Sequence, residues 1–342
     1  MALGTNQITT TTAAGGSANG KAFVPDLWSD EIAVAYKKNL VLANLIARMD
    51  HTGKFGAVVH VPSPVRTSAA TFYASQGVQI TPTVSTEGEF TVTINQHWVN
   101  SKQIPDVAEK QFMPSYRRFI TDDLSYSLAK AVDNYLHVTL APTFRGASAL
   151  AGAVIGSDGS TAWSATANTN TGNGAALTDA GIRKVTQTLD DLDVPGSDRF
   201  WVIPPAEKNR LLGLSRFTEQ AFVGEGGAAN SLRTGKVGDL YGVPVYVSSN
   251  CAFVDDNAGT ATVAAAQGTG THYRQAIYAH RDSAVLVEQI KPRVQAQYKV
   301  EYLSDVLVAD TLFGAALVRT LSTSAGSPDV TLDRGISVIV PA

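Results

Sequence analysis

One long helical pattern constrains the fold of this chain more than any other feature of its sequence. Apolar residues recur at helical spacing from Pro114, which suits a first helical turn, to Leu140, and Pro142 ends the pattern. A helix of this length spans about 40 Å. Any fold for the chain must therefore accommodate one extended helix. Its apolar stripe consists of Ile120, Leu124, Leu128, Val132, Leu136 and Leu140.

Alternating patterns predict strands on both sides of this helix in the sequence. The segments 58–61 and 90–94 flank a long excursion, and after Pro292 apolar residues alternate strictly with polar ones as far as Tyr302. The strict alternation predicts a strand that buries one face in a core and leaves the other face in water. Further strands are expected at 200–203, after a turn within 240–247, at 314–321 and at 336–340.

Three shorter helices are expected as well. The first covers residues 29–48, the second begins after the capping residue Thr178, and the third runs from about residue 205 to Leu214. The segment 145–177 is rich in Gly, Ala, Ser, Thr and Asn, and it predicts surface loops or short irregular strands.

The N-terminal residues have the composition of a flexible arm. Residues 1–22 carry almost no bulky side chains, so burial cannot repay the entropy of ordering them unless a partner is present. They contain no apolar core segment of a secretory signal. The most apolar run, 40–47, is much shorter than the roughly 20 residues of a membrane-spanning helix. We expect a protein that folds where it is made and has no membrane partner.

Charge and cysteine content exclude several classes of protein. The 27 basic and 30 acidic side chains give a net charge of -3, which lacks the positive excess of proteins that bind nucleic acid tightly through phosphates. The single cysteine, Cys251, cannot close an intramolecular disulfide. Because no cluster of Cys and His suggests a zinc site, we expect neither a metal ion nor a cofactor.

The sequence gives little support for a catalytic motif. None of the six histidines forms an HExxH or HxH pair, and His137, four residues after Asp133, is more typical of a helix-surface or packing role than of metal ligation. The segment GLSRF at 213–217 lacks the second glycine of a nucleophile elbow. The glycine-rich run at 224–227 lacks the GK[ST] ending of a phosphate loop.

Two remaining candidates also favour structural roles. The first is a cluster of four aspartates between residues 190 and 198, here called the acidic cluster. It predicts a solvated turn, because its spacing does not match a calcium loop. No basic residue near Cys251 in the sequence would lower the pKa of its thiol, so a buried structural thiol is expected. We therefore predict no enzymatic activity. The acidic cluster consists of Asp190, Asp191, Asp193 and Asp198.

The excursion at 62–88 indicates a subunit that assembles. It carries only Arg66 and Glu87 as charges, and loops of this length in compact domains are commonly functional or disordered. Its apolar residues favour docking on a neighbouring subunit. Together with the arm and the glycine-rich inserts, this loop suits an assembling protein better than a monomeric enzyme. The apolar residues are Phe72, Tyr73, Val78 and Ile80.

The order of these elements carries a resemblance to a known family. The segments that carry it are 27–32, 39–45, 56–62, 90–94 leading into 104–109, 128–133, 200–205 and GDLYGVPV at 238–245. In this order the chain resembles the major capsid (coat) proteins of tailed bacteriophages, which have the Hong Kong 97 (Johnson) fold. Its layout is closest to the coats of short-tailed phages. The resemblance implies an α+β fold with an N-terminal arm, an extended β-hairpin loop, a peripheral domain with a long spine helix, and an axial domain.

The resemblance also implies boundaries and contacts. It places the arm at 1–28, the N-terminal helix at 29–54, the extended loop at 55–100, the peripheral domain at 101–177 with its spine helix at 114–140, the axial domain at 178–280, and return strands with a C-terminal tail at 281–342. Assembly contacts are expected at Arg66, Phe72, Tyr73, Val78, Ile80, Gly226 and Gly227. Coats that lock themselves by isopeptide bonds need a lysine on the extended loop. Because no lysine occurs between Phe55 and Ser101, we expect no such crosslinking.

The function that the resemblance implies is mechanical. Hexamers and pentamers would form an icosahedral shell that encloses double-stranded DNA without reading its sequence. The protein would be located in the virion and assembled in the host cytoplasm, with separate scaffold and portal proteins and decoration proteins as partners. Two alternatives stay open: an encapsulin-like compartment that holds a cargo enzyme, and a hydrolase that uses Cys251.

Overall fold

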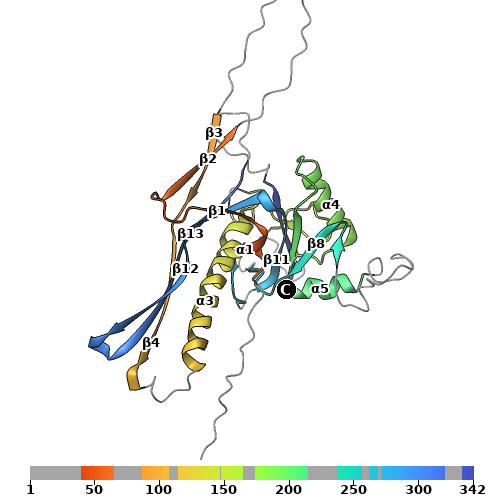
Figure 1. The fold of residues 1–342 in the computed structure, drawn as a ribbon. Helices are drawn as coiled ribbons and strands as arrows, with labels where there is room; N and C mark the ends of the chain where they lie inside the picture. Colours follow the sequence, from red (N-terminus) through yellow and green to blue (C-terminus); the bar gives the residue numbers. More distant parts are fainter. Residues whose placement is uncertain are drawn as a thin grey trace, which may run out of the picture.

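The computed structural model describes residues 40–64, 87–107, 115–146, 148–164, 174–214, 238–255, 262–268, 271–319 and 333–342. Two large sheets, one two-stranded hairpin and one long helix organise these residues (Figure 1). The expected arm and most of the excursion lie outside them. No helix in these ranges is long and apolar enough to cross a membrane.

A four-stranded sheet supports the long helix. Its order is β1 (Ala47–Asp50), β12 (Ala284–Lys299), β13 (Ser304–Leu317) and β4 (Gln96–Pro105), with only the β1–β12 pair parallel. Helix α3 (Ser115–Tyr135) runs along this sheet (Figure 1). Its apolar stripe packs on the sheet through Ile120, Leu124 and Leu128, which contact Ile104, Leu307 and Ala309.

The predicted helix at 114–140 is confirmed, but its winding changes near the end. After Tyr135 the helix continues as a π-helical turn, η2 (Leu136–Leu140), and then as a 3-10 turn, η3 (Ala141–Thr143). Leu136 and Leu140 are buried in this stretch. The apolar spacing predicts the extent of the helix and does not distinguish α from π winding, because both bury one side.

The predicted strands at 58–61 and 90–94 form a hairpin. Strand β2 (Val58–Pro64) pairs antiparallel with β3 (Glu87–Thr93), from Val58 opposite Thr93 to Pro64 opposite Glu87. At the base of the hairpin, Val92 packs with Val285 and Val287 of β12. The hairpin is thus anchored to the four-stranded sheet and extends away from it (Figure 1).

An eight-stranded sheet forms the second half of the fold. Strand β11 (Thr271–His280) lies at its centre, with β14 (Gly335–Pro341) on one edge and β9 (Phe253–Asp255) and β6 (Arg199–Ile203) sharing the other. The predicted strands at 200–203 and 336–340 are confirmed. The remaining strands are β10 (Thr262–Ala264) on β9, β8 (Val243–Val247) on β6, β7 (Asp239–Leu240) on β8, and β5 (Val154–Ile155) on β14.

Alternate residues of β6 face two hydrophobic cores. Phe200 and Val202 pack with the end of α3 and with β12, in the core that the two large sheets share. Trp201 and Ile203 face the opposite way, toward α4 (Asp179–Asp190) and α5 (Pro205–Leu212). Both helices confirm the sequence predictions. The oxygen of Thr178 accepts a hydrogen bond from the Gly181 amide at 3.1 Å, as expected of the cap of α4.

The expected helix at 29–48 is wrong at its C-terminal end. Only α1 (Leu42–Leu45) is helical in the described part of this segment, and Ile46 is already extended. Residues 47–50 instead form β1, paired with Val285–Glu288. The long-range pairing with β12 satisfies the backbone of this stretch, and local apolar spacing cannot reveal it.

The expectation of surface loops at 145–177 is only partly correct. The described part of the segment is irregular, with the two-residue strand β5, but several of its larger side chains are buried. Leu150, Ala153 and Trp163 form a core cluster with Tyr273 and Ile339. Small residues let the backbone approach closely: a Cβ on Gly152 would lie 2.3 Å from the carbonyl oxygen of Arg145.

Two strand boundaries near the C-terminal hairpin also differ from prediction. The strand expected to run to Tyr302 ends at Lys299, and a 3-10 turn, η6 (Val300–Tyr302), follows. Leu303 closes this turn in the left-handed conformation, with φ 44°. Strand β13 then begins at Ser304, ten residues before the start expected from the apolar run at 314–321.

Candidate assembly site

The assembly contacts expected from the sequence lie outside the described residues. This holds for Arg66, Phe72, Tyr73, Val78, Ile80, Gly226 and Gly227. The structure describes the strands from which the first five residues extend, since Pro64 of β2 pairs with Glu87 of β3. An exposed polar contact joins the two strands, with His60 Nδ1 3.0 Å from Glu89 Oε1.

The tip of the β12–β13 hairpin carries exposed apolar side chains, and the alternating pattern assigned two of them, Val300 and Tyr302, to a core. Val300 is 73%, Tyr302 62% and Leu303 63% exposed. Strict alternation correctly indicates an apolar face, but it does not say what covers that face. In one subunit, the described contacts of α3 with the sheet include Val294, Leu307 and Ala309, and none of the hydrophobic clusters includes Val300, Tyr302 or Leu303. Exposed apolar patches of this kind are typical of interaction surfaces.

Polar contacts hold the hairpin tip against the end of β4. The phenol of Tyr298 donates a hydrogen bond to Asp106 Oδ2 at 2.7 Å, and this contact raises the pKa of Tyr298. The guanidinium of Arg117, on the first turn of α3, lies 3.0 Å from the carboxylate of Asp305. The tip is therefore a defined surface of the subunit.

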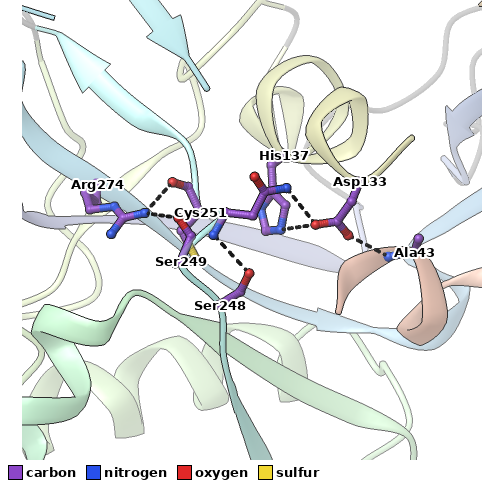
Figure 2. A network of polar contacts seen from close by, with 8 residues as sticks. Ala43, Asp133, His137, Ser248, Ser249, Cys251 and Arg274 are labelled. Atoms are coloured by element: carbon purple, nitrogen blue, oxygen red, sulfur yellow. Dashed lines mark hydrogen bonds and ion pairs between the residues drawn. The ribbon is translucent and has the colours of Figure 1, made fainter. Parts of the chain in front are cut away.

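A polar junction is buried where the two sheets meet (Figure 2). Asp133 of α3 is fully buried; its Oδ1 accepts a hydrogen bond from the Ala43 amide at 3.2 Å, and its Oδ2 accepts one from Asn250 Nδ2 at 2.7 Å. His137 Nε2 lies 3.7 Å from the same carboxylate. The expected packing role of His137 is confirmed, since its side chain is fully buried. This carboxylate connects α1, α3 and the loop before β9.

The same loop is held from its other side by Arg274 of β11. Its Nη2 donates hydrogen bonds to the carbonyl oxygens of Ser249 at 2.7 Å and Cys251 at 2.9 Å (Figure 2). The guanidinium also lies 4.4 Å from the ring centre of Phe253, and burial lowers the pKa of Arg274. Cys251 is 1% exposed, so the expectation of a buried thiol is confirmed and a substrate cannot reach it in this conformation.

The acidic cluster forms a turn around an arginine. Arg199 is buried; its Nη1 lies 2.7 Å from Asp190 Oδ1, and its Nε donates to the Pro195 carbonyl at 2.8 Å. Asp193 and Asp198 have positive φ angles of 56° and 55°. The described residues contain no group of three or more His, Cys, Asp or Glu side chains that could hold a metal ion.

Comparisons with known proteins agree with this arrangement. The sequence pattern of the phage capsid protein family matches residues 118–317, and no curated protein matches the chain. A solved structure from Mycobacterium phage Che8 has a TM-score of 0.65 at 21% identity over 92% of this chain and 97% of that chain.

Two further solved structures are named as capsids. The capsid of cyanophage P-SCSP1u has a TM-score of 0.69 at 17% identity over 99% of both chains. The capsid of Ralstonia phage GP4 has a TM-score of 0.65 at 16% identity over 97% of this chain and 98% of that chain. These likenesses show the α+β, Hong Kong 97-like fold. With the family pattern over more than half of its length, the chain belongs to the phage capsid proteins, the structural proteins of the viral shell.

Proposed function

We propose that this chain is the major capsid protein that forms hexamers and pentamers of an icosahedral shell around the double-stranded DNA genome of a tailed phage. The observation that carries the proposal is the apolar hairpin tip at Val300, Tyr302 and Leu303, which one subunit leaves exposed in a family of shell proteins. Covering such surfaces with copies of the same chain sums many modest contacts over a closed shell.

Further parts of the proposal concern the contents of the shell and its partners. A net charge of -3 suits a wall that encloses DNA without gripping it, since a strongly cationic wall would hinder packing and release. Separate scaffold and portal proteins, and decoration proteins, complete the particle, which assembles in the host cytoplasm. The layout of a short-tailed phage coat and the absence of isopeptide crosslinks remain predictions.

Electron microscopy of the purified protein, combined with light scattering after size exclusion, tests this proposal. Closed uniform particles or ring-shaped capsomers are the expected result. A monomer of 36.0 kDa that persists with every candidate scaffold would contradict it. Nuclease-protected DNA in native particles is expected, whereas particles that hold a cargo enzyme and no DNA would identify a compartment shell.

A further inference from the structure

A groove lies where α1 and α3 meet the β1–β12 edge of the four-stranded sheet. Its volume is about 680 Å³, and α1, β1, α3 and β12 all contribute to its walls. The apolar part of the lining includes Leu40, Met49, Val132 and Pro292. A groove of this size with an apolar floor could receive a segment of chain.

The rim of the groove carries two charged side chains that form no close ion pair with the described residues. The carboxylate of Glu288 is one of them; its charge acts on Lys291, but no cation among the described residues lies within ion-pair distance of it. Arg48 donates only to neutral oxygens there, the Ala43 carbonyl at 2.9 Å and Asn44 Oδ1 at 2.9 Å. By contrast, Lys291 Nζ and Asp50 Oδ2 pair at 2.8 Å. The groove therefore offers one negative side chain, Glu288, and one positive side chain, Arg48, that are not held in a close ion pair.

The chain itself arrives at this groove. Leu40 is the first described residue and belongs to the groove lining, so the 39 residues before it join the described chain at this point. The last part of that stretch, 27–39, has the sequence LWSDEIAVAYKKN, with five large apolar residues, acidic residues at one end and two lysines at the other. A segment attached directly beside a groove has a high effective concentration there.

We propose that residues 27–39 dock in the groove of their own chain, with their apolar side chains on its floor and Lys37 or Lys38 beside Glu288. Docking covers apolar surface in the single subunit and brings a positive side chain into close contact with Glu288 on the rim. It also fixes the point from which the rest of the arm leaves the subunit. The proposal goes beyond shell formation, because it requires no second copy.

Cysteine crosslinking of dilute subunits tests the docking. Tyr36→Cys is combined with Ala129→Cys, an exposed groove position on α3, and treated with a short bis-maleimide; the native Cys251 is buried and stays in place. The control pairs Tyr36→Cys with Gly196→Cys, an open and exposed position in the turn before β6. We expect an intramolecular crosslink in at least tenfold higher yield for the groove pair. Equal yields, or crosslinked dimers alone, would overturn the proposal.

Charge reversal gives a second readout in the same background. Glu288→Lys is expected to lower the crosslink yield severalfold, and adding Lys37→Glu and Lys38→Glu is expected to restore it. Glu301→Lys, the same change at the exposed hairpin tip, serves as the control. A loss that the lysine changes do not restore would contradict the pairing with Glu288. Neither experiment requires shells, so failure here leaves the capsid proposal untouched.

Discussion

Asp133 shows how a single residue can connect distant parts of the subunit. Its carboxylate accepts hydrogen bonds from α1 and from the loop before β9, which lie 90 residues before it and 117 residues after it in the chain. A buried charge is tolerated only when it is hydrogen-bonded or paired. The two donors and nearby His137 meet that requirement, so this position links the two sheets through polar contacts inside an apolar core.

Replacing Asp133 by alanine should therefore be costly. We expect Asp133→Ala to lower the free energy of unfolding by about 2–4 kcal/mol, because it leaves the Ala43 amide and the Asn250 side chain without their acceptor. Denaturant unfolding measures the change. Asp123→Ala, an exposed position on the same helix, is the matched control and should stay within about 0.5 kcal/mol of the wild type. Equal losses in both variants would argue against the junction.

A second residue, Asp310, predicts how stability depends on pH. Hydrogen bonds from Arg293, at 2.8 and 3.0 Å, lower the pKa of Asp310 from its ordinary value of 3.8. The folded pKa thus lies below the unfolded one, so this contribution to stability is complete above about pH 4 and is lost as the pH falls through the folded pKa. The loss of stability between about pH 5 and pH 2 should be smaller in Asp310→Asn than in the wild type.

Urea unfolding at a series of pH values measures this difference. Asp123→Asn, at an exposed position with no ion pair among the described residues, should follow the wild-type curve. An unchanged pH dependence in Asp310→Asn would show that the pair with Arg293 contributes nothing to acid sensitivity.

At the scale of elements, the local sequence predicts those helices and caps that are formed by contacts between residues close together in the chain. The spacing of Leu124 and Leu128 locates α3, and Thr178 locates the start of α4, because a helix stripe and a cap involve residues only a few positions apart. Strand β1 could not be predicted, since its pairing with β12 joins Ala47 to Val285. The exposed hairpin tip was missed because alternation defines an apolar face without stating its partner.

The candidate site, too, has features that the local sequence predicts and features that it does not. The Asp133 and His137 spacing is visible in the sequence, and the lack of a basic residue near Cys251 in the sequence correctly suggested a buried thiol. The contacts from Ala43, Asn250 and Arg274 arise from tertiary packing, so no local pattern signals them.

Helix α4 provides a prediction that reverses the usual helix propensity. Alanine is normally better than glycine in a helix by about 1 kcal/mol. At Gly181, however, a Cβ would lie 2.1 Å from the carbonyl oxygen of Gly156. We expect Gly181→Ala to destabilise the subunit by about 1–3 kcal/mol in thermal or denaturant unfolding. Gly196→Ala, where a Cβ meets nothing within 4 Å, should be neutral or slightly stabilising. A stabilising Gly181→Ala would refute this close approach.

At the scale of the whole molecule, the exposed tip should matter only when subunits meet. Val300→Glu is expected to leave the unfolding free energy within about 0.5 kcal/mol of the wild type, because the side chain is largely exposed, and yet to prevent closed shells. Light scattering and electron microscopy measure assembly. Gln297→Glu, an exposed polar position three residues earlier on β12, should still assemble. Normal particles from Val300→Glu would exclude the tip as an assembly contact.

The excursion between β2 and β3 leads to a related expectation. Deleting residues 66–86 leaves only Val65 between Pro64 and Glu87, so this last pair opens and the hairpin closes with a three-residue turn beyond the Ser63–Gly88 pair. We expect a soluble, folded subunit, verified by circular dichroism, that no longer forms closed shells. Shells of normal size and yield from this deletion would show that the loop is not needed to hold neighbouring subunits together.

Strand β14 has a consequence for the order in which the protein is made. It follows every other strand of the eight-stranded sheet in the chain, yet it fills one edge of β11 and supports β5, with Val338 opposite Val154. The carbonyl of Pro341 also accepts a hydrogen bond from Arg210 at 2.9 Å. A ribosome must therefore translate through residue 341 before this sheet can be completed. Prematurely terminated chains would lack β14 and keep an unpaired β11 edge. Finished subunits and fragments therefore differ in this sheet before any shell begins to grow.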